Sequence, residues 1–188
     1  MPKNKVEFGI SNLYVGTYTV DDDGDVTLGT PYHQAGAVGF SPEEQSDIYN
    51  FYADNIAYWS SYNGGTMEGD LTVAKFDDQF KTNFLGYVTL DDGGIALIKG
   101  ANKPKVFLMF QVEGDQESRR IIMYNVSLGA INREYNTIEE NKEPITESIP
   151  VTVTGDNGTG ITMVSYKETD AVYNSMFTTP PVPALPSE

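Results

Sequence analysis

The stretch Lys105-Val-Phe-Leu-Met-Phe-Gln-Val112 decides the fold class, because nearly all of its residues are apolar. Apolar residues on both faces of a short segment are typical of a central strand that is covered on both sides. A second apolar run, Arg120-Ile-Ile-Met-Tyr-Asn-Val-Ser-Leu128, follows after the polar residues 113–118. We therefore expect these two runs to pair as an antiparallel hairpin inside a sheet.

Outside this centre, other segments alternate apolar and polar residues with the period of a strand. Such segments are residues 13–20 and 54–63, and a last hairpin is predicted between residues 149–154 and 160–166. The tripeptide Asn63-Gly-Gly65 is typical of a turn between strands. Together the patterns predict a mostly β fold, an antiparallel β-sandwich or half-open barrel of about seven to nine strands.

One segment has the period of a helix. Phe76, Phe80 and Phe84 recur at every fourth position, and Gly86 stands where a C-terminal cap belongs. We expect one flanking α-helix over about residues 76–85. The end of the chain, residues 179–188, contains four prolines and predicts an extended or disordered arm after a single β-rich domain over residues 1–178.

The composition argues against an enzyme. The 188 residues include no cysteine and one histidine, His33, so thiolate metal sites, cysteine nucleophiles and histidine-based triads lack their residues. The acidic run Asp21-Asp-Asp-Gly-Asp25 fails the EF-hand pattern, because Val26 and Tyr32 stand where glycine and glutamate are required. No segment has the length and hydropathy of a signal peptide or membrane helix. We expect no enzyme activity, no cofactor, no metal, no membrane contact, and synthesis in the cytoplasm.

Charge and aromatic residues are both unevenly distributed. The formal net charge is −15, and residues 6–74 contain 11 acidic residues and no Lys or Arg. Such a segment repels nucleic acid, because binding to a duplex needs cations that displace condensed counterions. Within residues 49–62, six of fourteen side chains are aromatic. One strand pair buries a single face in its own core, so outward rings favour a partner surface.

Short motifs along most of the chain, in the same order, resemble the major tail proteins (tail-tube proteins) of long-tailed, non-contractile phages of Gram-positive bacteria. The motifs are Val6–Val15, Gly36–Gly39, Phe51–Asn55, Asn63–Gly65, Phe80–Gly86, Asp91–Gly94, Phe107–Asp115, Arg119, Arg120, Tyr124, Asn125, Pro144–Thr146 and Tyr173–Pro180. The resemblance implies a β-sandwich or half-open barrel with a flanking helix, similar also to the tube protein of type VI secretion systems. It implies a structural virion protein whose hexameric rings stack into the tail tube that conducts DNA.

From this resemblance and from the positions of the residues in the predicted strands and loops, we also hypothesise roles and partners. Residues 20–39 are expected to form an extended loop between rings, and residues 48–71 to form the ring or line its channel. The expected partners are other copies of the chain, a tape-measure protein, and the tail-initiator and tail-terminator proteins, while DNA passes transiently without tight binding. The interface candidates are Asp21, Asp23, Asp25, Phe51, Tyr52, Tyr58 and Trp59, and the lumen candidates are Asp54, Glu68 and Asp70.

Two other functions fit the same residues. A tail-terminator, baseplate or capsid-decoration protein of a phage shares this type of fold, but it forms one ring or none. A monomeric carbohydrate-binding β-sandwich would stack Trp59 and neighbouring tyrosines on sugar rings. Formation of filaments separates a tube protein from each of these alternatives.

Overall fold

A computed structural model describes residues 9–53, 56–114, 117–135, 137 and 144–186 of the chain. Its helix and strands, in chain order, are β1 (Gly9–Val20), β2 (Val26–Leu28), β3 (Tyr32–His33), β4 (Ala37–Ala53), β5 (Ile56–Val73), α1 (Asp78–Phe84), β6 (Tyr87–Thr89), β7 (Ile95–Leu97), β8 (Val106–Glu113), β9 (Arg120–Leu128), β10 (Glu147–Val153) and β11 (Met163–Tyr166).

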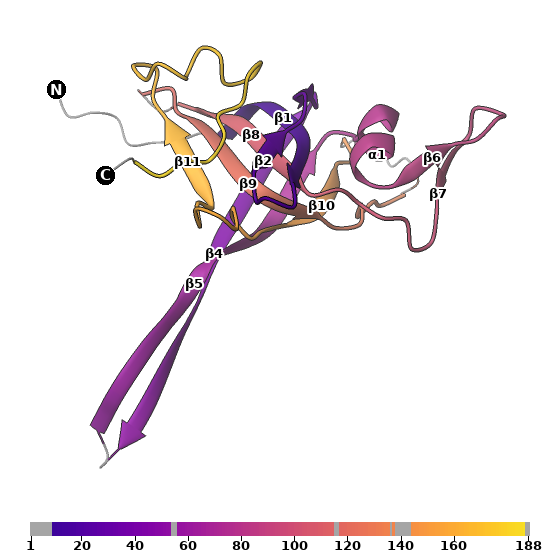
Figure 1. The fold of residues 1–188 in the computed structure, drawn as a ribbon. Helices are drawn as coiled ribbons and strands as arrows, with labels where there is room; N and C mark the ends of the chain where they lie inside the picture. Colours follow the sequence, from indigo (N-terminus) through magenta and orange to yellow (C-terminus); the bar gives the residue numbers. More distant parts are fainter. Residues whose placement is uncertain (1–8, 54–55, 115–116, 136, 138–143, 187–188) are drawn as a thin grey trace.

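Nine of these strands form one antiparallel sheet in the order β2-β1-β8-β9-β10-β5-β4, with β3 paired to β1 and β11 paired to β9. The order starts at β2 and ends at β4, so the sheet is open. Strands β6 and β7 form a separate two-stranded ribbon beside α1 (Figure 1). The predicted mostly β, antiparallel fold with one flanking helix is confirmed.

Strands β8 and β9 lie side by side near the middle of the sheet, as their apolar sequences predict. Side chains on both faces of β8 are buried: Leu108 and Phe110 point into one apolar cluster, and Phe107 and Met109 into another. The sheet is therefore covered on both sides at this point, which explains the unbroken apolar run.

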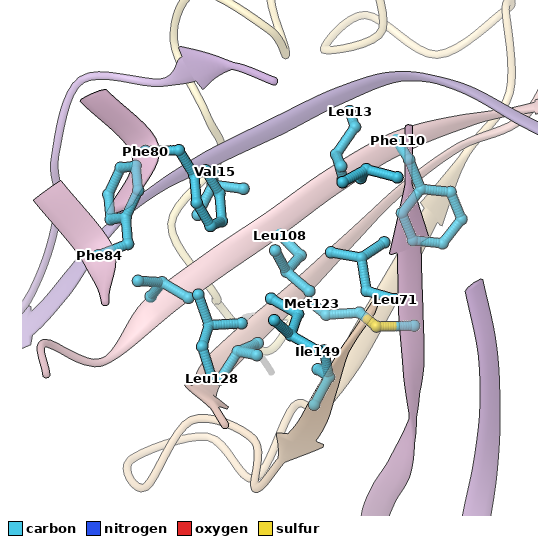
Figure 2. Close-up of a cluster of buried hydrophobic side chains, with 14 of the residues drawn as sticks. Leu13, Val15, Leu71, Phe80, Phe84, Leu108, Phe110, Met123, Leu128 and Ile149 are labelled. Atoms are coloured by element: carbon cyan, nitrogen blue, oxygen red, sulfur yellow. The ribbon is translucent and has the colours of Figure 1, made fainter. Parts of the chain in front are cut away.

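Helix α1 covers the first face of the sheet (Figure 2). Its N-cap is Asp77, whose carboxylate accepts a hydrogen bond of 2.7 Å from the backbone N–H of Phe80. The helix thus begins two residues later than predicted, and Phe76 lies just before the cap. Phe80 and Phe84 nevertheless pack against the strands, in the same cluster as Leu13, Leu71, Leu108, Leu128 and Ile149. Gly86 follows the helix with φ +73°, as a C-terminal capping glycine should.

The C-terminal part of the chain covers the second face. Met176 is fully buried there beside Tyr18, Phe107 and Tyr124. The guanidinium carbon of Arg120 lies 3.9 Å from the centre of the Tyr173 ring. Residues 170–179 form a series of turns in place of regular structure.

The arm after these turns lies against the domain. The hydroxyl of Tyr124 donates a 2.8 Å hydrogen bond to the carbonyl of Pro181, and Pro183 is buried. Residues 179–186 have no helix or strand, which agrees with the prolines that fill them.

The hairpin predicted between residues 149–154 and 160–166 is wrong. Strands β10 and β11 both pair with β9, with Val153 opposite Val126 and Met163 opposite Met123. The two strands therefore follow one another along the same edge of β9. Residues 154–162 form a loop between β10 and β11. The carboxylate of Asp156 stabilises this loop, because it accepts hydrogen bonds from the backbone N–H and the hydroxyl of Thr159.

Candidate functional site

A long hairpin, β4–β5, leaves the body of the molecule (Figure 1). Its base belongs to the sheet, because β10 pairs with β5 from Met67 to Val73. The hydroxyl of Thr162 donates a 2.7 Å hydrogen bond to the carbonyl of Gly65. Beyond that point β4 and β5 continue paired with each other, from Ser46 opposite Gly64 to Ala53 opposite Ile56. We call residues 46–53 and 56–64 the overhang; at about 3.4 Å per residue it extends about 30 Å past its support.

The turn predicted at Asn63-Gly-Gly65 is wrong, because β5 runs through these residues. The register shifts here, so that Gln45 is opposite Thr66 and Ser46 opposite Gly64, which leaves Gly65 as the extra residue of a β-bulge. Gly65 has φ +107°, a conformation that glycine adopts without steric cost. A glycine pair serves a bulge as well as a turn, and sequence alone does not separate the two.

Exposed apolar side chains gather toward the end of the overhang. Tyr52 is 65% exposed, Ile56 63%, Tyr58 74% and Trp59 54%. Three of these are predicted interface candidates, and Ile56 is an addition. The backbone of Phe51, the fourth aromatic candidate, pairs with Trp59, but its side chain lies outside the described part of the structure. Large exposed apolar groups of this kind at the end of an extended hairpin are typical of an interaction surface, and the interface role predicted for Tyr52, Tyr58 and Trp59 stays a prediction.

An acidic face lies at the base of the hairpin. Glu43 stands opposite Glu68, and Asp70 follows two residues after Glu68, so the three carboxylates share one face. All three are exposed, whereas the alternate residues Leu71 and Val73 are buried on the other face. Like charges directly opposite one another in a sheet are destabilising. The pair Glu43–Glu68 therefore lowers the stability of the sheet. Solubility alone does not require two carboxylates directly opposite one another.

The lumen candidates fall into two groups. Glu68 and Asp70 lie on this acidic face, while Asp54 lies outside the described residues. Glu43 was not among the lumen candidates predicted from the sequence, because only the strand register shows that it stands opposite Glu68. No Lys or Arg occurs in β4 or β5. Lys105, just before β8, is separated from β5 by the strands β9 and β10, and its ammonium group donates a hydrogen bond to the hydroxyl of Ser127.

The candidates Asp21, Asp23 and Asp25 lie in the hairpin that joins β1 to β2. The carboxylate of Asp21 accepts hydrogen bonds from the backbone N–H groups of Asp23 (3.0 Å) and Asp25 (2.8 Å), a side-chain-stabilised turn. After this turn β2 and β3 fold back on β1 of the same subunit. Residues 20–39 thus contain two short strands, and the role predicted for them between rings stays a prediction.

Within the described ranges, no group of three or more His, Cys, Asp or Glu side chains is arranged to hold a metal ion. Among the same residues, no helix has the length and apolarity needed to span a membrane.

The comparison with protein families identifies the group to which these features belong. The model of a family described as phage tail tube protein matches residues 2–159. The chain belongs to the phage tail tube protein family. Proteins of this family are structural parts of the phage tail and not enzymes, which confirms the prediction made from the composition.

Comparisons with individual proteins add two solved structures. The chain is similar to the cap that terminates the tube of the anti-feeding prophage, with 11% identity, a TM-score of 0.48, and coverage of 87% of this chain and 95% of that chain. It is also similar to a chain of the sheath-tube complex of an extracellular contractile injection system, PVC, in its extended state, with 9% identity, a TM-score of 0.45, and coverage of 86% and 94%. No curated protein matches the chain.

Proposed function

We propose that copies of this tail tube protein form hexameric rings, and that the rings stack into the tube through which DNA leaves the phage. The observation that carries this proposal is the overhang, which extends about 30 Å past the sheet and exposes Tyr52, Tyr58 and Trp59. A two-stranded hairpin is at best marginally stable by itself in water. In the proposed assembly, a neighbouring subunit packs against the overhang and buries its exposed rings.

The acidic face supports the second part of the proposal, passage of DNA. Glu43, Glu68 and Asp70 carry like charges on one exposed face. If this face lines the channel, each subunit contributes three carboxylates, and repulsion acts over a Debye length of about 8–10 Å at physiological salt. DNA then moves without adsorbing to the wall. In the virion, the tape-measure, initiator and terminator proteins are the proposed partners at the inside and the ends of the tube.

Electron microscopy tests the assembly. The purified chain, raised stepwise in concentration, is expected to form rings or hollow filaments of uniform width in negative stain. Stacked filaments support a tube subunit, and isolated rings point to the terminator alternative. A chain that stays monomeric at every concentration contradicts self-assembly, and a glycan screen with Trp59 fluorescence then tests the binding-module alternative.

Charge reversal tests the acidic face. A variant with Glu43, Glu68 and Asp70 all replaced by Lys should assemble and retain duplex DNA when its tubes are sedimented, with binding that falls steeply as salt rises. The matched control replaces the same three residues by Gln and removes the negative charge without adding cations. If tubes of the Lys variant retain no more DNA than wild-type tubes, the three side chains do not line the channel.

A further inference from the structure

The chain contains two Asn-Gly dipeptides, Asn63-Gly64 and Asn157-Gly158. In such a dipeptide the backbone nitrogen of glycine can join the side-chain carbonyl carbon of asparagine to form a cyclic imide, because glycine has no Cβ to oppose the approach. The structure places the two dipeptides in different surroundings. Their reactivity should therefore differ, although their local sequences are alike.

The first dipeptide lies inside a strand. Asn63 stands opposite Asp47, and Gly64 stands opposite Ser46, in the β4–β5 ladder. Closure of the imide requires the backbone at asparagine to rotate out of the extended conformation, which would break the pairing of the two strands. The fold therefore protects this dipeptide from the reaction.

The second dipeptide lies in the loop between β10 and β11. Asn157 and Gly158 are both exposed, and neither belongs to a strand. Their turn is closed by a 2.8 Å hydrogen bond from the N–H of Gly160 to the carbonyl of Asp156. The fold does not require glycine at position 158, because its φ is not in the left-handed region and an added Cβ would meet only the carboxylate of Asp156, at 3.5 Å. Alanine should therefore be tolerated at this position.

We propose that Asn157 is a site of spontaneous deamidation in the folded protein and that Asn63 is not. The backbone nitrogen of Gly158 attacks Cγ of Asn157, and the new N–Cγ bond closes the cyclic imide. The bond from Cγ to the side-chain nitrogen breaks, and this nitrogen leaves as ammonia with the proton that the backbone nitrogen has lost. Water then opens the imide at one of its two carbonyl carbons. The products are aspartate and isoaspartate, in which the main chain runs through Cγ. The reaction needs only water and does not depend on the proposed assembly.

Conversion of Asn157 affects a buried contact beside it. The buried carboxylate of Asp156 accepts a 2.6 Å hydrogen bond from the hydroxyl of Tyr18 and two further hydrogen bonds from Thr159. Either product places a second carboxylate next to Asp156, and like charges repel. Isoaspartate also lengthens the backbone between Asp156 and Thr159. The loop ends at Thr162, whose hydroxyl bonds to the base of the overhang, so the modification should loosen a support of the hairpin.

Peptide mass spectrometry tests the assignment. The purified chain is incubated in mildly alkaline buffer, once folded and once in urea, and is then digested with pepsin at acid pH. In the folded protein the peptide with Asn157 should acquire the mass of the deamidated form several times faster than the peptide with Asn63, whereas in urea the two rates should be alike. Gly158→Ala should slow conversion of Asn157 several-fold, because its Cβ opposes the attack. Equal rates in the folded protein, the same difference in urea, or no effect of Gly158→Ala would each overturn the proposal.

Thermal unfolding tests the effect on the loop. The midpoint of wild-type protein converted at Asn157 should lie about 2–4 °C below that of fresh protein, which is the shift expected from one lost hydrogen bond in a chain of this length. Gly158→Ala, incubated in the same way, is the matched control and should keep its midpoint. An unchanged midpoint of the converted wild type overturns the predicted effect on the contact between Tyr18 and Asp156.

Discussion

Replacing Phe80 by Ala should remove the contact that holds α1 on the sheet. Phe80 is fully buried, and its ring centre lies 4.9 Å from that of Phe76 and 5.3 Å from that of Phe84. About 150 Å² of ring surface at about 25 cal/mol/Å² corresponds to about 4 kcal/mol, within the range of about 3–5 kcal/mol known for such truncations. Alanine regains about 0.5 kcal/mol in helix propensity, which does not offset the loss.

A destabilisation of about 4 kcal/mol lowers the thermal midpoint of a chain of this size by roughly 8–16 °C. The assay is thermal unfolding followed by far-UV circular dichroism, because the one tryptophan, Trp59, lies in the overhang and does not report on the core. Asn83→Ala is the matched control, since Asn83 is an exposed residue of the same helix and its loss should change stability by less than about 0.5 kcal/mol. A loss below about 1 kcal/mol for Phe80→Ala would refute the docked helix.

Three further changes test other contacts. Tyr32 donates a 2.6 Å hydrogen bond to Asp77, and burial followed by this bond raises the pKa of Tyr32 from 10.0 to about 12. The hydrogen bond therefore contributes fully to stability below pH 10, and its contribution is lost as the pH rises toward 12. Tyr32→Phe should be about 1 kcal/mol less stable than the wild type at pH 8. In urea unfolding at increasing alkaline pH, the difference in stability between the two proteins should disappear. In Gly69→Ala the new Cβ meets the backbone oxygen of Ser41 at 2.2 Å, so the free energy of unfolding, measured with urea, should fall by about 1–3 kcal/mol. An unchanged free energy would show that the backbone at the base of the hairpin moves apart without cost. Tyr124→Phe removes a hydrogen bond to the C-terminal arm and should speed amide exchange in the arm about fivefold by mass spectrometry, whereas unchanged exchange would mean that the bond does not hold it.

The centre of the fold was predictable because its signals are local. An apolar run covers both faces of β8, and phenylalanines at every fourth position predict a helix, which contains Phe80 and Phe84. The helix begins two residues after and ends one residue before the predicted bounds, and its later start follows from Asp77, because aspartate is favoured both in the first turn and at the N-cap.

The length of the β4–β5 hairpin was harder to predict, because it does not depend on burial in the core. Beyond Gly65 the described side chains of β4 and β5 belong to neither core cluster, so apolar alternation no longer marks where the strands end. The Gly64-Gly65 pair then suggested a turn in the middle of β5. The acidic pair Glu43–Glu68 was equally hidden, since its members are 25 residues apart and meet only through the strand register.

The burial of Met176 against Tyr18 has a consequence for the order in which the protein is made. The two residues belong to the same apolar cluster, Tyr18 in the first strand of the sheet and Met176 in the turns that follow its last strand, β11. Contacts between distant parts of a sequence form late, because the whole intervening loop must first be closed. On the ribosome the second face of the sheet therefore stays uncovered until the segment around Met176 has been made. Interrupted synthesis leaves a chain with the overhang already made but the domain unfinished, and such a fragment exposes the surface around Tyr18 to proteolysis before it can join an assembly.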